Sequence, residues 1–256
     1  MIMRTALLWS PGVHLRDDDR RARRDRGQPE ERRRRGQPRP LVPPTLRPVA
    51  ATLLIVCVAA TVSLIALFHH HRQPGAIDAA VDAWIQASTG GQRKILNYLA
   101  ELGDLTPFIA MIAVLFLACL VTRRWRGAVL VALAVPAAAG ISDLILKPLV
   151  GRTLMGDLSF PSGHETRVFA LAAAFAVLLA SPLWPRIPAT ARWCLAAAVL
   201  LAACAVAVAL VGLDQHYFTD TIGGAAVGTA VVLATALVLD RLAPEAPRDR
   251  ARLPDV

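Results

Sequence analysis

The sequence predicts an all-α protein, a bundle of six transmembrane helices, from three observations. Of its 256 residues, 55% are hydrophobic, and the mean hydropathy is +0.48. The apolar residues form separate blocks of roughly 18–24 residues, the length that crosses a hydrocarbon layer about 30 Å thick. Charged residues lie between these blocks and at the two ends of the chain. This pattern is typical of an integral membrane protein and excludes an ordinary soluble domain.

The chain begins with a basic tail, residues 1–47, which contains the runs RDDDRRARRDRG and ERRRRGQPRP. It holds too few apolar residues to offset the entropy lost on ordering, so we expect it to be disordered. Basic runs can bind nucleic acid. Beside a membrane, a cytoplasmic tail that contacts anionic lipid fits better, and we expect no nucleic-acid partner. The apolar block that follows lacks a small-residue cleavage site, so the start is not expected to be a secretory signal peptide.

A six-span membrane domain is expected over residues 48–240, followed by a short cytoplasmic tail over 241–256. Between the first two spans, apolar residues recur at helical spacing with polar residues between them. This predicts an amphipathic surface segment broken at Gly90-Gly91. The six predicted spans are 48–68, 106–122, 127–146, 164–182, 191–213 and 220–239.

Arginines in the short loops predict the orientation of the chain. The segments 123–127 and 184–192 and the C-terminal tail all carry arginine, as cytoplasmic segments do. The N- and C-termini are therefore expected in the cytoplasm. The segments 147–163 and 214–219, which hold most of the unusual polar residues, are then expected outside it.

No metal or other cofactor is predicted. The four cysteines lie inside apolar blocks without metal-ligand spacing. The tract His69-His70-His71 could bind a metal. Three consecutive residues share no helix face, however, so an ordinary interfacial tract is the favoured interpretation.

Two polar clusters are the candidate functional residues. The first runs from Lys147 and Arg152 to Ser162-Gly163-His164, where a helix begins. Unpaired N–H groups at that helix start, with the serine hydroxyl and the helix dipole, favour a phosphate seat. The glycine lets the backbone approach a ligand. Lys147 and Arg152 would supply cations to the phosphoryl oxygens.

The second cluster lies in GLDQHYFTD, where His216 and Asp220 are four residues apart. On a helix the carboxylate could reach one imidazole nitrogen and leave the other free as a nucleophile. His164 could then protonate a leaving oxygen.

The motifs FPSGH and HYFTD make the chain resemble the type 2 phosphatidic acid phosphatase (PAP2) superfamily, six-span lipid phosphatases related to vanadium haloperoxidases. The resemblance covers about residues 50–240. It implies that His216 attacks phosphorus to give a phosphohistidine, that Asp220 orients His216, and that His164 is the acid. It also implies that Lys147, Ser162 and Gly163 hold the phosphate, without a metal.

Two positions depart from the family pattern. Leu154 and Leu210 stand where the family has phosphate-binding arginines. Arg152 is expected to replace the first arginine. Arg167, one turn after His164, could replace the second, or it could pair with Asp143 or Asp220. Each missing contact would cost about 3–4 kcal/mol of transition-state stabilisation if it were not replaced.

The leading functional hypothesis is a phosphatase of the cell membrane that acts on a lipid phosphate or pyrophosphate, of polyprenyl or phosphatidic-acid type, on the extracytoplasmic face. The alternative is a lipid-phosphate-binding or transport protein that has lost turnover. Haloperoxidase chemistry is disfavoured because those relatives are soluble. The oligomeric state is left open.

Overall fold

The computed structural model describes residues 40–181 and 187–242. The predicted tails fall largely outside the described residues, as do residues 182–186 between the fourth and fifth spans.

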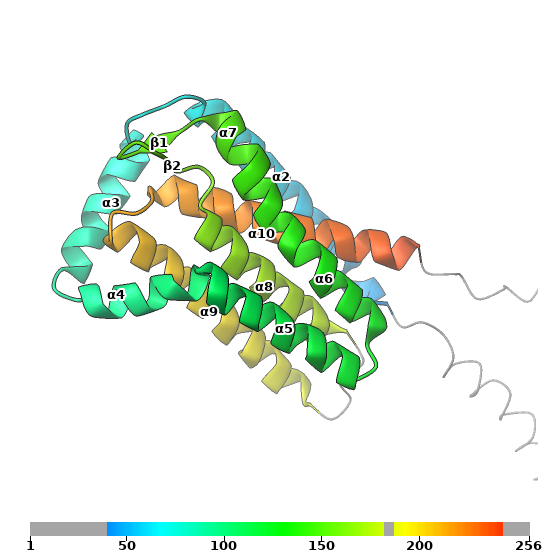
Figure 1. The fold of residues 1–256 in the computed structure, drawn as a ribbon. Helices are drawn as coiled ribbons and strands as arrows, with labels where there is room; N and C mark the ends of the chain where they lie inside the picture. Colours follow the sequence, from blue (N-terminus) through cyan, green and yellow to red (C-terminus); the bar gives the residue numbers. More distant parts are fainter. Residues whose placement is uncertain (1–39, 182–186, 243–256) are drawn as a thin grey trace, which may run out of the picture. The chain divides into compact units, whose positions relative to one another are not determined.

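The described residues form the predicted all-α bundle (Figure 1). Within residues 40–181 and 187–242, five helical stretches are long and apolar enough to cross a membrane. The sixth, α5, meets that standard only together with α4 and η2, from which it is bent by 54°. The spans correspond to α2 (Arg47–Phe68), α5 (Leu105–Val121), α6 (Trp125–Gly140), α8 (Gly163–Ala180), α9 (Ala189–Gly212) and α10 (Phe218–Arg241).

The third span is longer than the sequence predicts. Helix α6 continues through a π-helical stretch, η3 (Ile141–Leu146), into α7 (Lys147–Val150). The helix ends at Gly151, whose φ of 63° lies in the left-handed region that glycine adopts without a steric penalty. Stretches of π-helix are frequent at functional sites. This one carries Asp143 at its start and leads into Lys147.

Short elements cover one end of the bundle. The predicted amphipathic segment forms α3 (Ala76–Thr89), α4 (Arg93–Ala100) and η2 (Glu101–Gly103), with its break at Gly90-Gly91 as expected. In α3, Asp78 is fully buried, whereas Trp84 is exposed. A small antiparallel hairpin, β1 (Thr153–Leu154) and β2 (Asp157–Leu158), follows α7. The sequence did not predict this hairpin.

The predicted boundary of the N-terminal tail at residue 47 needs correction. Leu41 and Val42 are buried in the core, and both donate backbone hydrogen bonds to the carboxylate of Asp240 near the end of α10. A short 3₁₀ turn, η1 (Pro44–Leu46), then leads into α2. Apolar burial and two charge-assisted hydrogen bonds therefore fix the chain before the first span begins.

Glycines let α10 pack directly on the backbone of α8. A Cβ atom at Gly224 would lie 2.5 Å from the carbonyl oxygen of Ser162, and one at Gly228 would lie 2.5 Å from that of Thr166. Small residues four apart allow this close approach between membrane helices. The contact joins the start of α8, which carries His164, to the start of α10, just after His216.

Candidate active site

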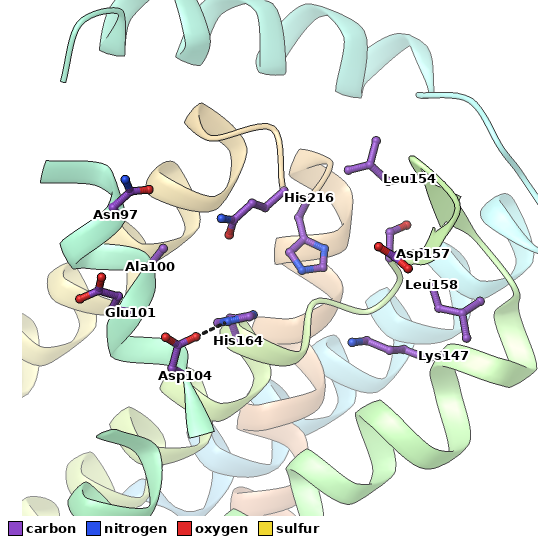
Figure 2. Close-up of a pocket in the computed structure, with 12 residues that line it drawn as sticks. Asn97, Ala100, Glu101, Asp104, Lys147, Leu154, Asp157, Leu158, His164 and His216 are labelled. Carbon is purple, nitrogen blue, oxygen red and sulfur yellow. Dashed lines mark hydrogen bonds and ion pairs between the residues drawn. The ribbon is translucent and has the colours of Figure 1, made fainter. Parts of the chain in front are cut away.

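The two predicted histidines face each other across one pocket. The ring centroids of His164 and His216 are 6.4 Å apart, although the residues come from separate helix starts. Both line a cavity of about 540 Å³ (Figure 2). The polar residues of the lining are Asn97, Glu101, Asp104, Lys147, Asp157, Ser159, His164, Gln215 and His216. The predicted convergence of the two clusters is thus present in the structure.

His216 lies close to Asp220, as the four-residue spacing predicts. Its Nδ1 atom is 3.8 Å from Oδ2 of Asp220, which is an ion-pair distance but too long for a hydrogen bond. Nδ1 is buried without a hydrogen-bond partner. Asp220 is fully buried and accepts hydrogen bonds from Arg152 and from the backbone N–H of Tyr217. The Nε2 atom of His216 is therefore the nitrogen on the far side of the ring from Asp220.

Arg152 does not bind in the pocket, which corrects the expectation from the sequence. It is fully buried, with Nη2 2.6 Å from Asp78 and Nη1 2.6 Å from Asp220. Nη1 also donates to the Thr219 hydroxyl. The reason is electrostatic, because a buried guanidinium requires opposite charge and two carboxylates supply it. Arg152 therefore links α3 to α10 beneath the site.

The ammonium group of Lys147, which belongs to α7, lies close to the start of α8, where the sequence predicts the phosphate seat. A Cβ at Gly163 would be 3.3 Å from the Lys147 Nζ atom and 2.5 Å from Oδ1 of Asp143. The space that Gly163 leaves open is thus filled by the ion pair of Lys147 with Asp143, at 3.1 Å. Arg167 also binds Asp143, with Nη2 2.9 Å from Oδ2. Of the two alternatives for Arg167, the structure shows pairing with Asp143.

Ser162 is used within the protein. It is fully buried, and its hydroxyl accepts a hydrogen bond from the backbone N–H of Glu165, which caps α8. Its own N–H donates to the carbonyl of Asp220 at 3.0 Å. Ser162 therefore ties the start of α8 to the start of α10. Its contact with phosphate, like that of Gly163, stays a prediction.

The two leucines that replace family arginines have different surroundings. Leu154, on β1, lines the pocket. Leu210, on α9, is fully buried in an apolar cluster with Leu96 and Ala100. The pocket therefore gains an apolar wall at position 154, whereas position 210 belongs to the packing between α4 and α9.

Sequence reasoning missed three carboxylates in the pocket lining, those of Glu101, Asp104 and Asp157. Asp104 is 2.9 Å from Nε2 of His164. No short motif contains it, and it is 60 residues from His164 in the chain. The available signal was its position directly before the second predicted span, at the same membrane face as the motif residues.

Two groups beneath the pocket, Asp82 and Tyr217, have raised pKa values, chiefly because they are buried. Burial raises the pKa of Asp82 on α3 to about 6, although the hydrogen bond from the Phe218 N–H opposes this rise. Burial also raises the pKa of Tyr217. Ionising either group would add a negative charge near Asp78 and Asp220.

Among residues 40–181 and 187–242, no three His, Cys, Asp or Glu side chains are grouped so that they could hold a metal ion. The pocket carboxylates are therefore spread around the lining rather than gathered at one point.

Residues 145–243 match the family model of the PAP2 superfamily. The predicted resemblance to the PAP2 superfamily is confirmed. The matched PAP2 region contains Lys147, His164, His216 and Asp220.

A solved structure extends the likeness to most of the bundle. It is the transmembrane PAP2-type phosphatidylglycerolphosphate phosphatase from Bacillus subtilis, with a TM-score of 0.59 and 16% sequence identity. The match covers 74% of this chain and 96% of that one. At this identity the likeness shows the fold, a PAP2-type membrane bundle. No curated protein matches the sequence.

Proposed function

We propose that the protein is a membrane phosphatase that hydrolyses a lipid phosphate or pyrophosphate through a phosphohistidine on His216. The observation that carries this proposal is the pair of imidazoles, 6.4 Å apart, facing one pocket with Lys147 in its lining. A phosphoryl group between the rings would meet a nucleophile on one side and an acid on the other. The PAP2 family match supports the same chemistry.

The proposed reaction has two steps. In the first, a ring nitrogen of His216 attacks phosphorus, the bond to the leaving oxygen breaks, and that oxygen takes a proton from His164. In the second, water attacks phosphorus, the phosphorus–nitrogen bond breaks with its electron pair returning to His216, and His164 accepts a proton from the water. Lys147, close to the start of α8, would hold the phosphoryl oxygens together with the N–H groups of that helix start. The side chain of Lys147 supplies the positive charge, so we propose no requirement for a metal.

An apolar groove beside the pocket supports a lipid substrate. It has a volume of about 550 Å³ and lies between α5, α8 and α9, with an entirely apolar lining. Leu102 of the groove directly follows Glu101 of the pocket, and Val168 lies one helical turn beyond His164. A lipid could therefore place its phosphate in the polar pocket while its tail follows the groove into the membrane.

Phosphate release from purified protein tests the proposal. Polyprenyl and glycerolipid phosphates of several tail lengths would be offered to the wild-type chain, to His216→Ala and to His69→Ala. We expect wild-type and His69→Ala to release phosphate, and His216→Ala to lose roughly a thousandfold or more, because the nucleophile is gone. Undiminished release by His216→Ala would remove His216 as the nucleophile. Release that requires added Mg²⁺ after EDTA treatment would contradict metal independence.

A second candidate function is lipid-phosphate binding without turnover. It is favoured because three candidate phosphate-binding cations are already paired with carboxylates. Lys147 and Arg167 both pair with Asp143, and Arg152 is buried between two carboxylates. Leu154 also leaves the pocket without the usual arginine. Saturable binding of a lipid phosphate by a wild-type protein that releases no phosphate would establish this function instead.

A further inference from the structure

We infer that Asp104 positions His164 as the acid of the reaction, an inference that rests on the proposed function. The Oδ1 atom of Asp104 is 2.9 Å from Nε2 of His164 (Figure 2). Asp104 occupies the residue before α5, where an aspartate commonly caps the helix. Its side chain makes no capping hydrogen bond there. The carboxylate is directed to the imidazole instead.

The backbone around Asp104 is held against the first turn of α8 by two further contacts. A Cβ at Gly103 would lie 2.7 Å from the Cβ of His164, so only glycine allows this approach. Nη1 of Arg167 donates a hydrogen bond of 3.0 Å to the carbonyl of Gly103. The place of Asp104 is therefore fixed independently of its own bond to His164.

The bond to Asp104 assigns the two nitrogens of His164. A carboxylate only accepts, so Nε2 carries a hydrogen and donates it, which leaves Nδ1 for the substrate. A negative charge at 2.9 Å also favours the protonated ring, the form that an acid needs before it acts. Burial of the ring, Arg167 and His216 oppose its protonation, and the carboxylate of Asp104 is the group that favours it.

In the proposed step, the phosphorus–oxygen bond breaks with its electron pair on the leaving oxygen. That oxygen takes the proton from Nδ1 of His164, which becomes neutral while Nε2 stays bonded to Asp104. Water later returns a proton to Nδ1 as it cleaves the phosphohistidine. Asp104 stays ionised throughout and never touches the substrate, so it is a positioning residue.

A comparison of leaving groups tests this role. An alkoxide needs a proton to leave, whereas a nitrophenolate does not, so only the first depends on the acid. For Asp104→Asn we expect kcat/KM to fall roughly tenfold or more with an alkyl lipid phosphate and to change little with a nitrophenyl phosphate. An equal fall for both substrates, or no fall for the alkyl substrate, would overturn the inference.

Glu101→Gln is the matched control. Glu101 lines the same pocket and lies on the turn before Asp104, but it contacts Asp104 through its backbone carbonyl. This variant removes the same charge and is expected to keep the wild-type ratio of the two rates. A ratio changed as much as in Asp104→Asn would attribute the effect to pocket charge and overturn the role of Asp104.

A readout without turnover separates this inference from the proposed function. Diethyl pyrocarbonate modifies neutral imidazole, so modification of His164, followed by mass spectrometry at several pH values between about 4 and 7, reports its protonation. We expect Asp104→Asn to be modified several times faster than the wild type at the pH values at which the wild-type ring is protonated. An unchanged rate would overturn the inference even if phosphate release is observed. A faster rate in a protein that releases no phosphate would retain the pairing and reject the proposed function.

Discussion

At the residue scale, Arg152 is a cation close to the candidate phosphate pocket that has a structural role. Its guanidinium lies 3.8 Å from the ring centroid of Phe68 and 4.3 Å from that of Tyr217. Asp78 and Asp220 complete its surroundings. All three charged groups are fully buried, so each depends on the others to offset its loss of hydration. Arg152 therefore controls the position of Asp220 and, through it, the surroundings of His216.

Replacing Arg152 should destabilise the fold strongly. Arg152→Met leaves the buried carboxylates of Asp78 and Asp220 without their cation, a loss of about 3–5 kcal/mol. We expect the melting temperature in detergent to fall by roughly 10 °C. The exposed Arg72 offers the matched variant Arg72→Met, which should melt within about 2 °C of the wild type. Equal melting temperatures for the two variants would contradict a structural role for Arg152.

The sequence predicts which residues gather near the pocket better than it predicts what their side chains contact. The sequence places His164, His216 and Lys147 in one pocket, because motifs at the ends of adjacent spans must share a membrane face. Arg152 was wrongly assigned to phosphate because its partner Asp78 lies 74 residues away and carries no motif. Asp104 was missed for the same reason. A side chain's partner depends on tertiary packing, which local spacing does not record.

At the element scale, the packing of α8 on α10 brings the two catalytic candidates together. Gly224 and Gly228 form a small-residue stripe on α10 that receives the backbone of α8. The N–H of Ser162 then reaches the carbonyl of Asp220 at 3.0 Å. The distance between the imidazoles therefore depends on glycines that lie outside the pocket.

A methyl group on that stripe should separate the helices. In Gly228→Ala the new Cβ would lie 2.5 Å from the Thr166 carbonyl and 2.8 Å from the Ala170 nitrogen, both backbone atoms. We expect a loss of about 1–3 kcal/mol in stability and a lower rate of phosphate release. Gly140→Ala is the control, since nothing lies within 4 Å of its added Cβ. If Gly228→Ala behaved like Gly140→Ala in both assays, the close packing of α8 and α10 would not be required.

The helices were more predictable than the connections between them. Apolar blocks long enough to span a membrane gave six helices whose ends agree with the structure within a few residues, apart from the third span, which continues to Val150. The hairpin of β1 and β2 was not predicted because each strand has only two residues, too few for a periodic pattern. The glycine stripe was visible in GGAAVG, but its partner helix was not.

At the scale of the whole bundle, the arginines at the α5–α6 turn and at the start of α9 lie at the end opposite the pocket, whereas Arg152 and Arg167 lie at the pocket end and pair with buried or partly buried carboxylates. Arg123, Arg126 and Arg192 lie near the turns at the end where α2 begins and α10 finishes (Figure 1). The hairpin, α3 and the starts of α8 and α10 lie at the other end. Cytoplasmic loops are rich in arginine, so this distribution supports the proposal that the pocket is extracytoplasmic.

Labelling of single cysteines tests this orientation. In a chain whose four native cysteines are replaced, Met155→Cys at the exposed tip of the hairpin should react with a membrane-impermeant thiol reagent on intact cells. Arg123→Cys, at the other end, should react only after the membrane is permeabilised. The reverse pattern would place the pocket in the cytoplasm and refute the proposed orientation.

The central claim is that His216 attacks a phosphoryl group held between two imidazoles. Rapid quenching of the full-length protein with a ³²P-labelled lipid phosphate, followed by peptide mapping under alkaline conditions, tests it most directly. The account predicts acid-labile phosphate on His216 in the wild type and none in His216→Ala. Label found on another residue, or rapid phosphate release with no label on His216, would contradict it.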